Sequence, residues 1–479
     1  MAVLVGIEPQ EVFQYFEEIA GIPHGSGNTG AIRDYLYAFA GEHKLGVYTD
    51  MTNNVLIKKK ASQGLEGHET VILQGHMDMV CVHEPGTDID MEREPIRLVC
   101  DGEKLTAEGT TLGGDDGIAV AMILAILASD TIEHPPIEAL FTSDEEIGMV
   151  GAQAFDTGLL DGRRLINLDS EDEGIFTCGC AGGATVMGCV PLEHDQDGQG
   201  EICQIVVEGL KGGHSGTEID QGRANAHVLL GRVLQQLAET DDTWQLIRVA
   251  GGSKDNAIPA RAEAYVRGDR DTFARVAEAC QGIFISEYEK ADPDIRVRVD
   301  AATESDMAMT EDSKRRVIDL LCTLPNGIQK MSPDVEGLVQ TSLNMGILRT
   351  VENTVCVGFS VRSSVAEEKA ELINRVSQLV QDMGGRPETA GDYPGWSYRK
   401  ESPLRDHMTA VFETMYGKKP VIDVIHAGLE CGFFVEEIEG LDAISIGPDM
   451  TGVHTPAETL DVASVARTWA FLLEVLQGL

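Results

Sequence analysis

Histidine and carboxylate side chains recur in this sequence close to short apolar segments. The residues that share this placement are His76, Asp78, Asp115, Glu145, Glu146, Asp169 and His454. Two histidines with several carboxylates suit borderline divalent ions such as Zn²⁺, Co²⁺ or Mn²⁺, and this many carboxylates suit a pair of ions with a shared ligand. Each residue alone has an ordinary explanation, such as a helix N-cap for Asp115 or a solvated loop for Glu146. Their joint recurrence favours a metal site.

The first third of the chain alternates segments typical of strands with segments typical of helices. Strands are predicted over 54–58, 70–73, 137–141 and 165–168, and helices over 29–40 and 117–128. This alternation predicts an α/β fold, a mostly parallel sheet with helices on both faces. Ligands of such sheets bind outside the carboxyl ends of the strands. Because His76, Glu145 and Asp169 follow predicted strands, we expect them at one edge of one sheet.

The pattern changes near the glycine-rich residues 178–184. Alternating segments at 185–190, 204–210, 244–250 and 262–266, with helical stretches between them, predict an α+β unit with an antiparallel sheet. Helical and strand-like segments resume after 391–396, which is typical of a linker. We therefore expect a catalytic α/β domain over 1–182 and 393–479, interrupted by a large inserted α+β domain over 183–392.

Composition excludes several classes of protein. The 479 residues are 43% hydrophobic and 24% charged, which excludes a disordered chain. A net charge of −42 argues against nucleic-acid and membrane partners. The longest apolar run, 118–128, is shorter than the roughly 18 residues of a membrane-spanning helix. We expect no signal peptide, and the ten scattered cysteines predict reduced thiols in a cytoplasmic protein.

Several motifs resemble those of a known family, the dinuclear-zinc exopeptidases related to aminoacylase and glutamate carboxypeptidase. The matching motifs are GHMDMV (75–80), LGGDDGIA (112–119), TSDEEIGMVGA (142–152), NLDSE (167–171) and GVHTP (452–456), in the order of the family. GGHSG (212–216), HAGLECG (426–432) and the chain length resemble the bacterial aminoacyl-histidine dipeptidase branch more closely.

The resemblance implies a role for each matching residue. His76, Asp115 and Asp169 would bind one metal ion, and Asp115, Glu146 and His454 would bind a second, so that Asp115 bridges the two. Asp78 would orient His76, and Glu145 would be the general base that activates a metal-bridging water. The family also has a cis peptide bond after its bridging aspartate, which here is Asp115–Asp116.

The inserted domain would act as a lid. His214 would stabilise the oxyanion, with a histidine in a glycine-rich turn as the alternative. Asn256 and Arg362 would hold the substrate carboxylate, with a surface salt bridge as the alternative for Arg362. Glu430 would receive the free α-amino group of the substrate, with a charge on a helix surface as its alternative. The resemblance also implies a homodimer.

The resulting hypothesis is a metallo-dipeptidase that hydrolyses unblocked dipeptides, Xaa-His dipeptides among them. Two divalent ions, Zn²⁺ before Co²⁺ or Mn²⁺, would be its cofactors. One alternative is an N-deacylase or amidohydrolase on the same scaffold, which would lack a pocket for a free amine. A second is a non-catalytic binding protein, and a mononuclear enzyme is a third.

Overall fold

The computed structural model describes residues 3–195, 198–304 and 307–479, which divide into two units. The first unit comprises Met1–Cys180, Trp396–Val424 and Leu429–Leu479, and the second comprises Ala181–Gly395 and Ile425–Gly428. The second unit thus includes four residues from the C-terminal part of the chain. Ile425–Gly428 belongs to it because the Ala181 N–H donates to the carbonyl oxygens of Ile425 (3.1 Å) and Ala427 (3.0 Å).

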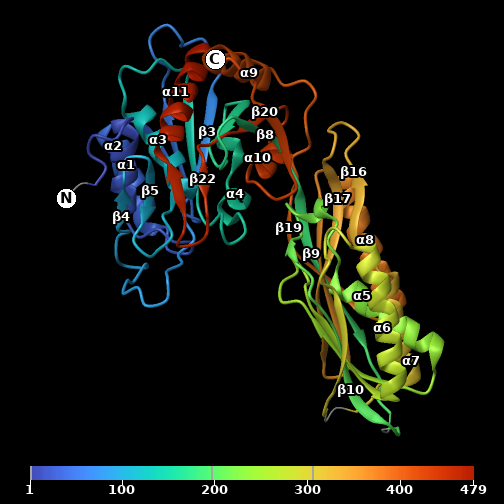
Figure 1. The fold of residues 1–479 in the computed structure, drawn as a ribbon. Helices are drawn as coiled ribbons and strands as arrows, with labels where there is room; N and C mark the ends of the chain where they lie inside the picture. The colour runs from blue at the N-terminus through green and yellow to red at the C-terminus, as the bar shows by residue number, and fades with distance from the viewer. Residues whose placement is uncertain (1–2, 196–197, 305–306) are drawn as a thin grey trace. The chain divides into compact units, whose positions relative to one another are not determined.

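The first unit is built on an eight-stranded sheet in the order β1-β2-β6-β3-β7-β21-β8-β20 (Figure 1). Its central strands β6, β3, β7 and β21 are parallel, which confirms the predicted α/β fold. The flanking strands β2 and β8 are antiparallel to the central strands that they pair with, and β1 is antiparallel to β2. The strands are β1 (Gly46–Thr49), β2 (Val55–Lys59), β3 (Val71–His76), β6 (Ile137–Thr142), β7 (Arg164–Asn167), β8 (Ile175–Cys180), β20 (Val421–Ile425) and β21 (Asp442–Ser445).

Helices cover this sheet, whose central strands β3 and β6 are buried at every position. Burial on both faces is typical of a parallel sheet between helical layers. The helices of this unit are α1 (Gln10–Ala20), α2 (Gly30–Glu42), α3 (Gly114–Ala128), α4 (Val150–Ala154), α9 (Pro403–Tyr416), α10 (Cys431–Glu437) and α11 (Val462–Gly478). The helix α3 is apolar on all sides, as its sequence predicts, and is buried along nearly its whole length. No helix of the described residues has both the length and the apolar character needed to cross a membrane.

The register of the parallel strands brings their carboxyl ends to the same level. His76 at the end of β3 pairs with Thr142 at the end of β6, and Asn167 at the end of β7 pairs with Ser445 at the end of β21. The loops that follow these strands therefore leave the sheet at one edge. This edge carries the residues that the sequence singles out.

A small second sheet of the first unit holds the segment around His454. Its order is β22-β23-β5-β4, with β22 (Met450–Thr451), β23 (Thr459–Asp461), β5 (Lys104–Ala107) and β4 (Leu98–Cys100). The strands β22 and β23 are antiparallel and are joined by residues 452–458, which form a hairpin turn. Pairing of Leu460 with Leu105 anchors this hairpin to the rest of the unit.

The second unit is an antiparallel sheet with four helices packed on its strands (Figure 1). The predicted α+β character of this part is confirmed. The sheet runs β15-β10-β14-β12-β17-β18-β9-β19, with β16 beside β17, and a separate ladder joins β11 and β13. The elements are β9 (Gly182–Pro191), β10 (Glu201–Glu208), β11 (Gly213–His214), β12 (Gln245–Gly251), β13 (Ala257–Ile258), β14 (Ala262–Gly268), β15 (Arg296–Ala301), β16 (Gly327–Met331), β17 (Val339–Val351), β18 (Thr354–Ser363), β19 (Arg386–Tyr393), α5 (Ala226–Thr240), α6 (Arg270–Glu287), α7 (Glu311–Thr323) and α8 (Ala366–Asp382).

The predicted linker 391–396 is in part a strand, because β19 continues to Tyr393, which pairs with Gly183 of β9. A glycine is needed at position 182, where an added Cβ would lie 2.4 Å from the backbone nitrogen of Gly395. The chain segments around Gly182 and Gly395, at the two ends of the inserted part, therefore pack directly against each other.

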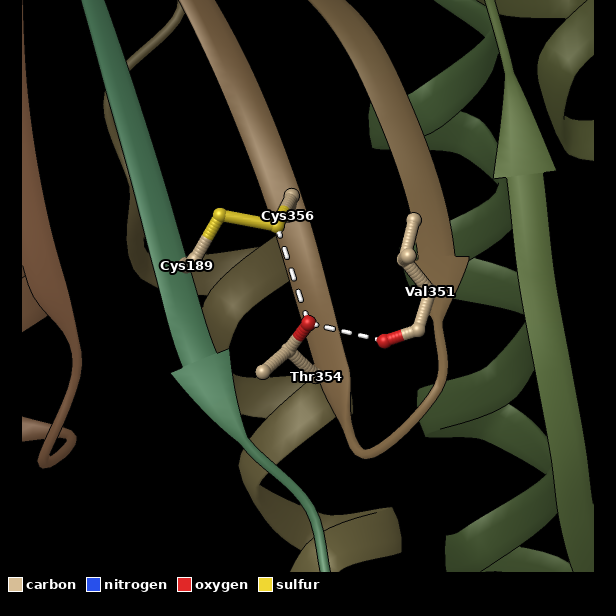
Figure 2. The surroundings of a disulfide bond; sticks show 4 residues. All are labelled: Cys189, Val351, Thr354 and Cys356. Atoms are coloured by element: carbon tan, nitrogen blue, oxygen red, sulfur yellow. Dashed lines mark hydrogen bonds between the residues drawn. A yellow bond between two sulfur atoms is a disulfide. The ribbon is translucent and has the colours of Figure 1, made fainter.

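A disulfide joins Cys189 of β9 to Cys356 of β18, which are opposite each other in the antiparallel register (Figure 2). Their Cα atoms are 4.1 Å apart. The prediction of reduced thiols is wrong for this pair, because 167 residues separate the two cysteines and only the strand register brings them together. The free cysteines of the described residues are Cys81, Cys100, Cys178, Cys180, Cys203, Cys280, Cys322 and Cys431.

Truncation of Ile123 in α3 is expected to destabilise the first unit strongly. The Ile123 side chain is 0% exposed, so Ile123→Ala should lower the free energy of unfolding by about 2–5 kcal/mol through lost burial and a residual cavity. Ile283 of α6 is 50% exposed, and Ile283→Ala is the matched control, expected to change stability by about 0.5 kcal/mol or less. Urea denaturation followed by circular dichroism measures both. Equal small effects would contradict the assignment of α3 to the core.

Candidate metal centre

The carboxylate of Asp115 lies between two histidines at the edge of the first unit's sheet. Nε2 of His76 is 3.0 Å from Oδ1 of Asp115, and Nε2 of His454 is 3.2 Å from Oδ2 of the same carboxylate. His76 ends β3, Asp115 lies in the first turn of α3, and His454 lies in the β22–β23 hairpin. The two histidines therefore contact different oxygens of the same carboxylate.

Further carboxylates complete each side of Asp115. Oδ1 of Asp169 is 3.5 Å from Nε2 of His76, and Oε1 of Glu146 is 2.9 Å from Nε2 of His454. Ligands held at about 2.0–2.2 Å by a tetrahedral ion are separated from one another by about 3.3 Å. On the side of His454, the donor atoms of Asp115, Glu146 and His454 have types and spacing that suit a divalent ion. On the other side, His76 is close to both Asp115 and Asp169.

Among the described residues, three groups of donor atoms lie within 4.8 Å of one another and could hold a metal ion. These are His76 with Asp116 and Asp169, His76 with Glu145 and Glu146, and Asp115 with Glu146 and His454. The Asp115–Asp116 peptide bond is cis, as the family resemblance predicts.

Several carboxylates lie close together at this edge of the sheet, around the two histidines. Burial lowers the pKa of His76, but neighbouring carboxylates, Asp169 first, outweigh it and raise that pKa well above its usual value. Hydrogen bonds to the carboxylates of Asp115 and Glu146 raise the pKa of His454 to about 10. Burial raises the pKa of Asp169 to about 6. The carboxylates thus favour a positive charge beside them, which a bound cation would also supply.

Asp78 supports both His76 and the following loop. Nδ1 of His76 donates to the carbonyl oxygen of Asp78 at 3.0 Å and lies 3.5 Å from its Oδ1. The Asp78 carboxylate accepts the N–H groups of Glu145 (3.0 Å) and Glu146 (3.4 Å) and the hydroxyl of Ser26 (2.8 Å). The side chain of Asp78 thus places the Glu145–Glu146 loop relative to His76.

Glu145 lies beside His76 and Glu146, and the residue is partly exposed. Burial raises the pKa of Glu145 well above its usual value, and the charges of Asp169, Glu430 and Glu146 act in the same direction. The loop that carries Glu145 follows β6, and its two ends lie close together. An added Cβ at Gly151 would be 2.4 Å from the carbonyl oxygen of Ser143. Only a glycine allows this approach.

Glu430 precedes α10 and is fully buried, so it is not a charge on a helix surface. Its Oε2 accepts from Nε2 of Gln74 and from the hydroxyl of Thr142, both at 2.6 Å, whereas Oε1 is buried without a hydrogen-bond partner. Burial raises the pKa of Glu430 to about 8. The side chain is therefore a buried acid within hydrogen-bond reach of strands β3 and β6.

In the second unit, His214, Asn256 and Arg362 lie close to one another. His214 of β11 pairs with Ala257 of β13, directly after Asn256, whose carbonyl oxygen accepts the Ser215 N–H at 2.8 Å. An added Cβ at Gly216 would lie 3.0 Å from Cε1 of His214 and 3.2 Å from Nε of Arg362.

The surroundings of Arg362 differ from those of a surface salt bridge. Arg362 is 7% exposed and donates from Nη1 to the hydroxyl of Tyr393 at 3.0 Å. Its Nε is buried and has no hydrogen-bond partner. A buried guanidinium N–H without an acceptor is a position that a carboxylate would satisfy.

Sequence reasoning missed two carboxylates of the metal edge. Oδ2 of Asp116 accepts the N–H of His76 at 3.2 Å, and its Oδ1 is buried without a partner. Glu458 accepts hydrogen bonds from the backbone at the start of α3. The adjacency of Asp116 to Asp115 was an available signal. No local pattern distinguishes Glu458 from other acidic residues near a strand, since its partners are more than 340 residues away.

Comparison with known proteins agrees with this geometry. Residues 72–478 match the model of the family described as Peptidase family M20/M25/M40. The chain belongs to this peptidase family, which confirms the predicted class of enzyme.

Two relatives match along the full length of the chain. The chain is 36% identical over 481 residues to the cytosol non-specific dipeptidase of Escherichia coli (strain K12), covering 100% of this chain and 99% of that protein. The aminoacylhistidine dipeptidase of Vibrio alginolyticus has a crystal structure that matches with a TM-score of 0.93 at 38% identity, covering 99% of this chain and 98% of that one. The aminopeptidase PepT of Bacillus cereus, at 16% identity and a TM-score of 0.57 with 98% of each chain covered, shares the fold.

Addition of Zn²⁺ to the metal-free protein is expected to release protons. Histidine must be deprotonated to bind a metal, and a His454 with a pKa of about 10 is protonated at neutral pH. Proton competition weakens as pH rises, so the apparent affinity for Zn²⁺ should increase between about pH 6 and pH 8. Proton release in weak buffer with a pH indicator measures this, and His454→Gln should release fewer protons. Binding without proton release would contradict the assignment.

Proposed function

We propose that the protein is a metal-dependent dipeptidase that hydrolyses unblocked dipeptides, Xaa-His dipeptides among them. The observation that carries this proposal is the Asp115 carboxylate, whose two oxygens face His76 and His454, with Glu145 beside His76. Two relatives support the substrate class, since a non-specific dipeptidase at 36% identity and an aminoacylhistidine dipeptidase at 38% identity both match along the full length of the chain.

The cofactors of this proposal are two divalent ions, Zn²⁺ before Co²⁺ or Mn²⁺. His76, Asp115 and Asp169 would hold one ion, and Asp115, Glu146 and His454 the other, because Nε2 of each histidine lies 2.9–3.5 Å from the two carboxylates of its set. Such ions, when bound, lower the pKa of a coordinated water and polarise the substrate carbonyl.

Glu145 would act as the general base. It takes a proton from the attacking water and then passes that proton to the leaving amine. Two features suit it to both steps: the Asp78 carboxylate holds its backbone N–H, and burial raises its pKa, so that the carboxylate accepts a proton readily.

The side chains of the second unit would bind the substrate and stabilise charge. Arg362, whose Nε is buried without a partner, and Asn256 would hold the substrate carboxylate, which suits the planar guanidinium. His214 would donate a hydrogen bond to the oxyanion that forms from the substrate carbonyl. In this proposal the second unit is a lid that excludes water during turnover.

Glu430 would receive the free α-amino group of the substrate. Its Oε1 is buried and has no partner, so an ammonium group would satisfy it. We also propose, from the resemblance, that the protein is a homodimer. A cytoplasmic location is proposed because the full-length relative from Escherichia coli is a cytosol dipeptidase.

A panel of small peptides tests this function directly. Metal-free protein reconstituted with Zn²⁺, Co²⁺ or Mn²⁺ is expected to cleave β-Ala-His, Leu-His and Ala-Ala, and to leave N-acetyl-His and a tripeptide intact. Release of free amino acids, followed by chromatography, measures each reaction. Cleavage of N-acetyl-His alone would identify a deacylase instead, and inactivity with every metal would favour a binding protein.

Replacement of the base is expected to separate metal binding from catalysis. Glu145→Gln keeps the size of the side chain but removes its ability to accept a proton, so turnover should fall by at least about 100-fold. Metal content should remain that of the unchanged protein, because the proposed ligands do not include Glu145. Steady-state hydrolysis of Leu-His and elemental analysis of the same sample measure both quantities. Near-normal turnover would exclude Glu145 as the base.

A further inference from the structure

Glu458 closes the hairpin that carries His454 and contacts the start of α3. The side chain is 3% exposed, and both of its oxygens accept backbone N–H groups. Oε2 accepts from Leu112 (2.8 Å) and Gly113 (3.2 Å), and Oε1 accepts from Gly114 (2.8 Å) and Asp115 (3.3 Å). One carboxylate thus binds four consecutive N–H groups, the last of which belongs to Asp115.

An ordinary helix cap explains part of this arrangement. The first N–H groups of a helix have no partner within it, and a carboxylate there satisfies them and interacts favourably with the helix dipole. A cap does not need to come from any particular part of the chain. Here it comes from the residue four positions after His454, on the same hairpin. The hairpin therefore makes two contacts with Asp115. His454 contacts its carboxylate, and Glu458 accepts a hydrogen bond from its backbone N–H.

The hairpin itself keeps these two contacts at a fixed separation. The Thr455 N–H donates to the carbonyl oxygen of Gly452 at 3.1 Å, and the Glu458 N–H donates to the carbonyl oxygen of Thr455 at 3.0 Å. On the side of the helix, an added Cβ at Gly114 would lie only 3.2 Å from Oε1 of Glu458. The Glu458 carboxylate therefore packs closely against the start of α3, directly before Asp115.

From this geometry we propose that Glu458 is a positioning residue for the metal centre. It fixes the backbone of Asp115 so that one carboxylate oxygen faces His76 and the other faces His454. The inference rests on the proposed function, in which Asp115 is shared between two metal ions. Loss of the Glu458 carboxylate would let the start of α3 move relative to the hairpin, and would weaken metal binding although no ligand atom is removed.

The test compares Glu458→Gln with a matched control, Glu138→Gln. Glu138 is also a buried carboxylate (2% exposed), and it also accepts backbone N–H groups, those of Asp161 and Gly162 at 3.0 Å. It lies in β6, away from the metal residues, and pairs with Lys58. Both variants remove a buried acceptor from the same unit, so both should lower the melting temperature of the metal-free protein. Only Glu458→Gln should lower the affinity for Zn²⁺, by about 10–100-fold.

Affinity is measured by competition with a chromophoric chelator, with Zn²⁺ as the only added metal and the full chain as the protein. Zn²⁺ binding by Glu458→Gln as tight as that of the unchanged protein would overturn the inference, and so would equal weakening in the two variants. Should Glu458→Gln not fold, Glu458→Asp takes its place, because its shorter side chain cannot span all four N–H groups. Absence of Zn²⁺ binding by the unchanged protein would contradict the proposed function as well as this inference. Normal Zn²⁺ binding by the Glu458 variant would contradict only the inference.

Discussion

The candidate metal centre depends on one carboxylate, that of Asp115, which lies beside two histidines from distant parts of the chain. His76 comes from the end of a parallel strand, His454 from a hairpin, and Asp115 itself from the start of a buried helix. These three elements meet only if the sheet, α3 and the small hairpin sheet are all in place. The core packing of this unit is thus the condition for the site, and the aligned strand ends give the site its location.

Electrostatics explains why such an edge needs cations. Asp115 and Glu146 have oxygens within 4.8 Å of each other, and Asp169 lies 3.5 Å from His76, so that carboxylates outnumber the histidines at this edge. Burial raises the pKa of Asp169 and of Glu145, and neighbouring carboxylates act in the same direction. Backbone N–H groups and imidazoles reduce the repulsion in the metal-free protein. Divalent ions would reduce it further and would use the same side chains as ligands.

Much of this arrangement could be predicted from the sequence, because two local rules act together. Alternating strands and helices predict a parallel sheet, and residues that directly follow such strands gather at one edge. His76, the loop of Glu146, and Asp169 follow this rule, and the structure places their side chains together. The burial of α3 could also be predicted from the sequence, since its residues are apolar on all sides of the helix.

The features that were missed depend on contacts between distant residues. Glu458 differs from other acidic residues only through its four backbone partners around position 113, and Cys189 meets Cys356 only through strand register. The burial of Glu430 and the assignment of Ile425–Gly428 to the second unit likewise follow from packing that no short pattern encodes. Periodicity and spacing describe single elements, and these features arise between elements.

The central claim, that Asp115 is shared by two metal ions, is tested most directly by anomalous diffraction from crystals grown with Zn²⁺. Data collected on both sides of the zinc absorption edge should show two anomalous peaks about 3.5–4 Å apart. One peak should lie between His76 and Asp169 and the other between Glu146 and His454, each within bonding distance of one Asp115 oxygen. A single peak at full zinc occupancy, or two peaks that do not share Asp115, would contradict the account.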